Sequence, residues 1–241
     1  MVETMSKYLI ALDDGHGMQT AGKRTPPIQE LNNRIIHENE FNRAVVNYLS
    51  SELKRCGVDT LLVAPTDVDT SLSARTNLAN SKKVDLYISI HYNAFDGSFG
   101  GKNPSGLSVH CYPGSSKSRK LAECVHKYLK QGTKQIDRGI VESNFHVLRE
   151  TKMPAILSEN GFMDNKSEAM LMIDEEFRKE VAREHAKGIC DYLGVEYTEE
   201  EKEETIYRVQ VGAYSNQNNA NKVRERLKLL GYNAIVVASK Q

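Results

Sequence analysis

Four polar side chains of this sequence have the types that hold a catalytic metal and move a proton. They are two imidazoles, His16 and His91, and two carboxylates, Glu38 and Glu159. Two imidazoles and one carboxylate are a common ligand set for catalytic zinc, which keeps a fourth position open for water. The metal lowers the pKa of that water and polarises a carbonyl, and a second carboxylate can pass the proton to a leaving amine. We interpret His16, Glu38 and His91 as ligands and Glu159 as the general base.

Each of these groups stands at one end of a predicted element. Three of them follow or close apolar segments typical of buried strands, which span 8–12, 84–90 and 154–159. Glu38 opens a segment with apolar residues at helical spacing, 38–56. Ligands of open α/β sheets bind beyond the carboxyl ends of the strands, so parallel neighbouring strands would bring the four groups together. Spacing alone leaves open that they are structural residues at strand ends.

Strand-like and helix-like segments alternate through the first 194 residues. Further strands are predicted over 58–63 and 107–112, and further helices over 72–81, 115–129, 166–172 and 174–193. Repeated strand–helix–strand order predicts an α/β fold with a mainly parallel, twisted sheet and helices on both faces. The segment 95–106 is rich in Gly, Ser and Asn and predicts a loop. We expect a catalytic domain over residues 6–194.

The composition changes after this domain. Residues 196–205 (EYTEEEKEET) carry six acidic residues and no aliphatic one, which favours a solvated acidic linker over 195–205; a charged helix tail is the alternative. The last segment, 206–241, predicts a small β-α-β unit, with strand-like patterns at 206–213 and 232–238 around a helix at 216–230. Units below about 40 residues rarely fold alone. Such a unit pairs with another copy, docks on the main domain, or is half of a truncated module.

Charge and composition exclude several classes of protein. Lys plus Arg is 32 and Asp plus Glu is 32, which argues against electrostatic attachment to nucleic acid or anionic membranes. No run approaches the roughly 20 apolar residues of a membrane span. The apolar run 8–12 is too short for a signal peptide and no cleavage site follows it, so we expect synthesis in the cytoplasm without an export signal. The four cysteines form no CxxC pair and suit a reduced chain.

The motifs around the four groups resemble those of the zinc-dependent N-acetylmuramoyl-L-alanine amidases (type 3), the cell-wall hydrolases of bacterial autolysins and phage endolysins. The resemblance spans about residues 7–193, with every motif in the family's order. The matching motifs are Asp-x-Gly-His-Gly at 13–17, Glu and Asn at 38 and 42, Arg and Ala-Asn at 75 and 79–80, Ser-Ile-His-x-Asn-Ala at 89–94, Val-Leu-Arg and Pro at 147–149 and 154, and Glu-x-Gly-Phe at 159–162.

This resemblance implies a reaction and a set of site residues. The reaction is hydrolysis of the amide that joins the lactyl group of N-acetylmuramic acid to L-alanine in peptidoglycan. His16, Glu38 and His91 would hold zinc, and Glu159 would be catalytic. Asp13 is predicted to support an imidazole, and the predicted substrate-binding residues are Asn42, Arg75, Asn93 and His146.

Some residues leave alternatives open. His37 beside Glu38 makes the choice of ligand ambiguous, and the motif register favours Glu38. His146 either contacts substrate or is structural, and the other histidines, His110, His126 and His185, are predicted to be structural or solvated. Three positions depart from the family pattern, with Asp14 where Pro is common, Arg43 where Leu is usual and Ser158 where Val is frequent.

The C-terminal unit resembles half of the sporulation-related repeat (SPOR) domain, a peptidoglycan-binding module. The matching residues are 207–214 (YRVQVGAY), Asn219, Ala220, Leu227 and the Gly-Tyr pair at 231–232. A tail without a binding role is the alternative. The resemblance implies an enzyme that acts on the wall after release by lysis or a holin. The rival functions are a zinc-dependent peptidase that cuts within the stem peptide and a non-catalytic wall-binding protein.

Overall fold

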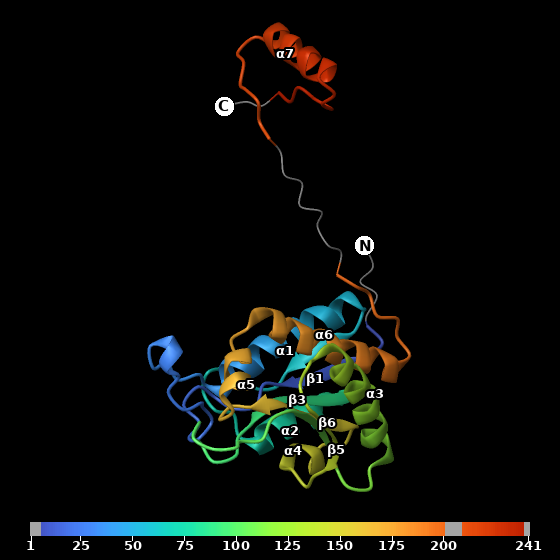
Figure 1. Ribbon diagram of the computed structural model, residues 1–241. Helices are drawn as coiled ribbons and strands as arrows, with labels where there is room; N and C mark the ends of the chain where they lie inside the picture. The colour runs from blue at the N-terminus through green and yellow to red at the C-terminus, as the bar shows by residue number, and fades with distance from the viewer. Residues whose placement is uncertain (1–5, 201–208, 239–241) are drawn as a thin grey trace. The chain divides into compact units, whose positions relative to one another are not determined.

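The computed structural model of the protein describes residues 6–200 and 209–238. The chain divides into two compact units, residues 1–200 and 201–241, which are described separately (Figure 1). The described strands of the first unit are β1 (Leu9–Asp13), β2 (Asp59–Leu62), β3 (Leu86–Asn93), β4 (Leu107–Cys111), β5 (Asp137–Glu142) and β6 (Ala155–Phe162). Its described helices are η1 (Gln29–Leu31), α1 (Glu38–Arg55), α2 (Leu72–Lys82), α3 (Ser116–Gly132), α4 (His146–Arg149), α5 (Lys166–Leu171) and α6 (Glu175–Leu193). No helix in the described part of the chain has the length and apolarity to cross a membrane.

These strands form one sheet in the order β2-β1-β3-β6-β4-β5. The strands β2, β1, β3 and β6 run parallel, as do β4 and β5, whereas β4 runs antiparallel to β6. The prediction of an α/β fold with a mainly parallel sheet is therefore confirmed. The antiparallel pair places the start of β4 beside the middle of β6, with Ser108 opposite Glu159.

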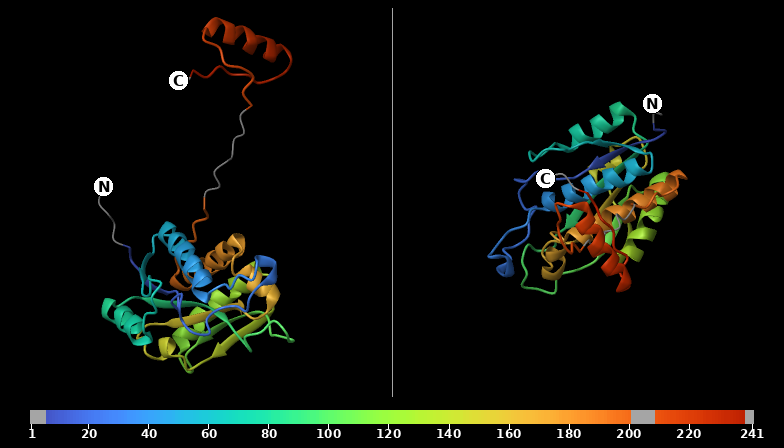
Figure 2. Two further views of the ribbon diagram at one scale, coloured as in Figure 1. Left: turned by 90° about the vertical axis from the view of Figure 1, so that its left-hand side faces the viewer. Right: turned by 90° about the horizontal axis from the view of Figure 1, so that it is seen from above.

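Helices cover both faces of the sheet, as predicted. The helices α1, α3 and α6 pack on one face, and α2 and α4 pack on the other (Figures 1 and 2). Successive strand side chains point to opposite faces. Leu12 and Ile88 therefore join the core under α1 and α6, whereas Ala11 and Tyr87 join the smaller core under α2 and α4. Burial on both faces explains why the central strands are apolar almost throughout.

Most predicted elements form within a few residues of their predicted limits, because their end signals are local. Four helices begin after a residue whose side chain accepts a hydrogen bond from the backbone N–H three positions on. These residues are Ser71, Ser115, Asn165 and Asp174. The segment 95–106 contains no helix or strand, as predicted.

Besides the three-residue helix η1, two described elements, β5 and α4, were not predicted. The sequence of β5 (DRGIVE) is half-exposed and shows no alternation, because this strand lies at the edge of the sheet and is held by pairing with β4. The helix α4 is a single turn of four residues, which is too short for a helical period to be visible. Both elements depend on contacts with distant segments and not on a local pattern.

The chain leaves the first unit later than its composition predicts. Residues 195–200 have no helix or strand, but Tyr197 packs against the core and donates a hydrogen bond to Glu52 of α1. Arg55 Nε also donates to the carbonyl oxygen of Thr198 at 2.9 Å. The start of the predicted linker is therefore attached to α1, since its aromatic ring and carbonyls find partners there. Residues 201–205 lie outside the described residues.

The second unit contains the predicted helix, α7 (Gln217–Leu229), which begins after Asn216. The two predicted strands are wrong for its described residues, because 209–213 and 232–238 form no strand. The remainder of the first one, 206–208, lies outside the described part. A strand needs a neighbour to satisfy its backbone N–H and C=O groups, and none pairs with these segments among the described residues. No residue of α7 is buried, so residues 209–238 offer no core that would hold two strands together.

The close packing of α6 on α3 gives a test of the fold. A Cβ atom on Gly188 would lie 2.4 Å from Val125 Cα, so Gly188→Ala should lower the free energy of unfolding by about 1–3 kcal/mol through overpacking. Chemical denaturation of the purified protein measures this. Gly100→Ala is the matched control, because the nearest atom to its added Cβ would be 3.9 Å away. Equal stability of the two variants would contradict the described packing.

Candidate active site

The strands β1, β3 and β6 are parallel neighbours, and their carboxyl ends bring the predicted groups together. Asp13 pairs with Ser89 across β1 and β3, and His91 pairs with Glu159 across β3 and β6. His16 lies three residues beyond the end of β1, and Glu38 is the first residue of α1. The sequence analysis expected the four groups to converge only if these strands were parallel neighbours, and the structure shows that they are.

His16, Glu38 and His91 form a cluster that could hold one metal ion. One ligand atom from each residue lies within 4.8 Å of the other two. His91 Nδ1 is 2.9 Å from Glu38 Oε1, and His16 Nε2 is 3.7 Å from Glu38 Oε2. Glu38 Oε2 is buried without a hydrogen-bond partner, and the Lys23 ammonium lies 3.8 Å from it. Two nitrogens and an unsatisfied carboxylate oxygen suit zinc.

The start of α1 aims Glu38 into this cluster. His37 is the N-cap residue of the helix, and its backbone N donates to the Glu40 carboxylate at 2.9 Å. His37 is not part of the cluster. Asn42, one turn along α1, donates from Nδ2 to Glu38 Oε1 at 3.2 Å and is fully buried. Asn42 therefore orients Glu38, and its predicted contact with substrate stays a prediction.

Asp13 supports His91 through a hydroxyl group and not directly. Ser89 Oγ donates to Asp13 Oδ2 at 2.9 Å and lies 3.1 Å from His91 Nε2. Asp13, which was predicted to support an imidazole, therefore acts on His91 through Ser89. Arg75 is the other partner of Asp13, at 3.3 Å, and is only 2% exposed. The Arg75 guanidinium is therefore engaged in a buried ion pair with Asp13, and its predicted contact with substrate stays a prediction.

Two glycines make room for the ligands in the segment 13–17. Gly15 has a φ of +68°, and a Cβ there would lie 2.5 Å from the ring of His91. A Cβ on Gly17 would lie 2.5 Å from the backbone N of Asp69. The Asp-x-Gly-His-Gly spacing is thus a packing requirement of the turn that carries His16.

Glu159 lies beside the cluster on β6. Its Oε2 atom is buried without a hydrogen-bond partner. Burial, together with the charge of Glu38, raises the pKa of Glu159 to about 7, against the opposing effect of His91. A carboxyl with a pKa near neutrality can both accept and return a proton at physiological pH, as a general base requires.

The two imidazoles experience different electrostatic environments. Burial lowers the pKa of His16 to about 4, so this ring is neutral at pH 7 and able to bind a metal. Burial also acts against the charge of His91, but the hydrogen bond and negative charge of Glu38 outweigh it and raise the His91 pKa. Glu38 responds in the opposite sense, because His91 holds the Glu38 pKa well below its usual range despite burial.

The last two predicted substrate residues make other contacts or none in the described structure. Asn93 ends β3, and its Oδ1 accepts from the backbone N of Ala94 at 2.8 Å. His146 begins α4, and its Nε2 is buried without a partner. Among the described residues, no hydrogen bond joins either side chain to the four central groups. Their predicted contact with substrate stays a prediction.

Sequence reasoning missed a second polar network, behind β6. Fully buried His185 of α6 lies with Nε2 2.9 Å from Ser158 Oγ and Nδ1 2.7 Å from the Val181 carbonyl oxygen. Asn160 Nδ2 donates to Ser158 Oγ at 3.1 Å and to the carbonyl oxygen of His91 at 3.0 Å. Ser158 thus has a polar partner under α6, and the only sequence signal for it was the departure from Val.

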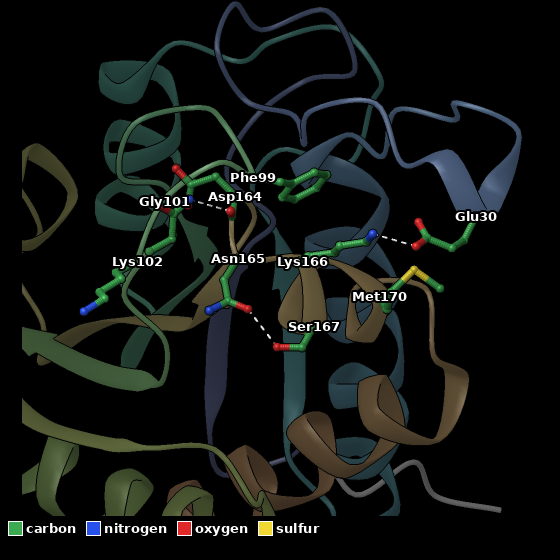
Figure 3. A pocket seen from close by; sticks show the side chains of 10 residues that line it. Glu30, Phe99, Gly101, Lys102, Asp164, Asn165, Lys166, Ser167 and Met170 are labelled. Atoms are coloured by element: carbon green, nitrogen blue, oxygen red, sulfur yellow. Dashed lines mark hydrogen bonds and ion pairs between the residues drawn. The ribbon is translucent and has the colours of Figure 1, made fainter.

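A shallow groove of about 570 Å³ lies where the chain continues beyond β3 and β6 (Figure 3). Its wall from the loop 95–106 is anchored by Asp164, whose Oδ2 accepts three backbone N–H groups at 2.6–2.9 Å. Lys166 and Glu30 pair at 2.5 Å across the groove. None of the four central groups lines it.

Comparison with known proteins identifies the family. Residues 10–191 match the profile of the N-acetylmuramoyl-L-alanine amidases. The chain is 32% identical over 229 residues to the N-acetylmuramoyl-L-alanine amidase CwlM of Bacillus licheniformis, covering 95% of this chain and 84% of that protein. It is 35% identical over 193 residues to the endolysin of Bacillus phage SPP1, covering 79% and 68%.

Solved structures agree with the profile. The N-acetylmuramoyl-L-alanine amidase from Clostridium difficile 630 superposes with a TM-score of 0.70 at 32% identity, over 78% of this chain and 97% of that one. The catalytic domain of the amidase CwlV from Bacillus (Paenibacillus) polymyxa var. colistinus has a TM-score of 0.69 at 33% identity, over 78% and 99%. The chain therefore belongs to the N-acetylmuramoyl-L-alanine amidase family and is an enzyme of that class.

The C-terminal part also has a family match. Residues 175–238 match the SPOR domain profile, which agrees with the resemblance found in the sequence. The match begins upstream of the predicted start at 206 and includes α6. In the structure, α6 packs within the first unit against the core shared with α1 and α3.

The raised pKa of Glu159 predicts how the stability of the metal-free protein depends on pH. A carboxyl whose pKa rises from 4.5 to about 7 on folding stabilises the fold below pH 4.5 and loses that contribution as the pH rises through 7. Glu159→Gln carries no such charge. We expect this variant to melt at a higher temperature than the parent at pH 8, with a smaller difference at pH 5. Thermal melts in chelator measure this.

Glu123→Gln is the control for this prediction. Its side chain is 56% exposed on α3, so its removal should shift both melts equally. Parallel pH profiles for Glu159→Gln and the parent would mean that Glu159 titrates in the folded protein as it does in the unfolded chain.

Proposed function

We propose that this amidase hydrolyses the bond between the lactyl group of N-acetylmuramic acid and L-alanine with one zinc ion held by His16, Glu38 and His91. Glu159 is the general base. The observation that carries the proposal is the three ligand atoms within 4.8 Å of one another, with Glu159 paired to His91 on the next strand.

The ligand residues are prepared for a metal ion by their surroundings. Ser89 donates to Asp13, so the Ser89 oxygen accepts from the Nε2–H of His91 and leaves Nδ1 to face Glu38. The proton that Glu38 holds on Nδ1 leaves when a metal binds. When bound, zinc lowers the pKa of a water molecule and polarises the scissile carbonyl.

Glu159 moves the protons of the reaction. It takes one from the attacking water and gives it to the nitrogen of L-alanine as the amide C–N bond breaks. The products are a free lactyl carboxylate and a stem peptide with a new amino terminus. A Glu159 pKa of about 7 places both proton transfers within reach at neutral pH.

Peptidoglycan is the substrate in this proposal, and the C-terminal unit gives the enzyme a second contact with the cell wall. The SPOR match over 175–238 supports wall binding. Exposed apolar side chains such as Tyr214 and Tyr232 lie in that unit, and aromatic rings of this kind suit contact with sugars and peptides.

Substitution separates the roles of the four groups. Glu159→Gln should keep zinc and lose hydrolysis by at least about 100-fold, because an amide cannot accept the water proton. His16→Ala, Glu38→Ala and His91→Ala should lose both. Zinc content by atomic absorption and hydrolysis of purified peptidoglycan measure this. Near-normal turnover by Glu159→Gln would contradict the role of Glu159 as the general base.

The nature of the products tests the reaction itself. The purified chain should clear a peptidoglycan suspension, stop in chelator and recover with zinc. Mass spectrometry should then find stem peptides that begin with free L-alanine. Other new amino termini would indicate the peptidase. Wall binding that survives chelator, with no soluble products, would indicate the binding protein.

A further inference from the structure

Two arginines hold the turn that carries His16. Arg75 of α2 contacts Asp13 at 3.3 Å and Asp69 at 2.9 Å. Arg43 of α1 makes a parallel set of contacts one residue further along the turn. Each guanidinium therefore ties one aspartate of the turn to the segment 64–70 that follows β2.

The contacts of Arg43 are numerous and short. Its Nε lies 2.5 Å from Asp14 Oδ2, and its Nη1 lies 2.8 Å from Asp67 Oδ1. Its Nη2 donates to the carbonyl oxygen of Thr66 at 2.5 Å. The carbonyl oxygen of Asp67 in turn accepts from the backbone N of Met18, at 2.9 Å. The turn, α1 and the segment after β2 are thus joined at one side chain.

This junction connects two of the three segments that supply metal ligands. Asp14 lies two residues before His16 in the same turn, and Arg43 lies on α1, whose first residue is Glu38. The strands alone do not fix this distance, because His16 lies beyond the end of β1 and Glu38 is the first residue of α1. Side chains of α1 tie the two segments together: Asn39 Nδ2 donates to the carbonyl oxygen of His16 at 2.5 Å, and Arg43 binds Asp14.

The Asp14 side of this ion pair is buried, so the carboxylate depends on Arg43 for its counter-charge. Asp14 is 3% exposed, and its other oxygen, Oδ1, is buried without a partner. Removing Arg43 would leave a buried carboxylate without its counter-charge. Asp14 and Arg43 are also two of the three positions that depart from the family pattern, and the structure makes them partners of each other.

We propose that the Asp14–Arg43 ion pair is a positioning device for the metal centre, which holds the His16 turn at the distance from Glu38 that one zinc ion requires. The proposal rests on the zinc site proposed above. Residues that orient metal ligands from outside typically contribute 10–100-fold to metal affinity, and we expect an effect of that size.

Arg43→Leu is the decisive variant, because charge and geometry predict opposite results for it. Loss of a nearby cation would by charge alone tighten zinc binding. Loss of the tie should weaken it by at least 10-fold. Competition with a chromophoric chelator measures zinc affinity directly, without any readout of hydrolysis. Hydrolysis by Arg43→Leu should also recover partly in excess zinc.

Three further variants complete the test. Arg34→Leu is the matched control, since it removes an arginine 2.5 Å from Glu40 of the same helix, at a site 48% exposed, and zinc affinity should change less than twofold. Arg43→Lys keeps the positive charge but loses the planar guanidinium that contacts several acceptors at once. This variant replaces Arg43→Leu in the test if Arg43→Leu does not fold. The double variant Asp14→Ala/Arg43→Leu should regain thermal stability relative to Arg43→Leu but stay weak in zinc binding.

The outcomes separate this proposal from the one it rests on. Weak zinc binding by a stable double variant supports positioning. Recovery of zinc affinity together with stability would overturn positioning in favour of a purely structural pair. Unchanged or tighter binding by folded Arg43→Leu would also overturn it while the metal centre stands. No zinc binding by the parent chain would overturn both.

Discussion

The buried carboxylate of Glu38 is the constraint on which the rest of the site depends. A negative charge at a buried position is unfavourable unless positive charge or hydrogen bonds compensate it. Here His91, Asn42 and the backbone of Tyr92 converge on Oε1, and Oε2 is left facing His16 and the Lys23 ammonium. The same imbalance that would destabilise an ordinary core makes this place receptive to a cation. The turn with its two glycines brings His16 to that oxygen, and the start of α1 places Glu38 beside His91 of β3.

The topology of the sheet determines which groups reach this carboxylate. Three parallel neighbours end at the same edge, so His91 and Glu159 fall in register while His16 extends past β1. Because successive side chains of a strand point to opposite faces, neighbouring residues of β6 contact different parts of the protein. Glu159 points toward the metal cluster, and Ser158 points toward His185 under α6. A helix far from the reaction is therefore connected through Ser158 and Asn160 to the backbone of His91.

The second unit illustrates the opposite situation. Its helix forms because the signals for a helix are local, including the cap at Asn216. Its apolar residues remain exposed, and its strand-like segments remain unpaired in the described range. Strands are stabilised by partners and not by their own sequence. A match to the SPOR profile that extends back into α6 shows that sequence similarity and structural units need not share a boundary here.

The sequence by itself determined the α/β class, the main strands and helices, and the four polar groups at strand ends, because periodicity, caps and motif spacing are written locally. The family followed from the same motifs. Only the tertiary structure decided what Asn42, Arg75 and Asp13 do, since their roles depend on which side chain lies opposite them after folding. It likewise decided that β5 forms, that Asp14 meets Arg43 and that Ser158 meets His185. These contacts join residues that are distant in the chain, and a single sequence carries no local signal of such a pairing.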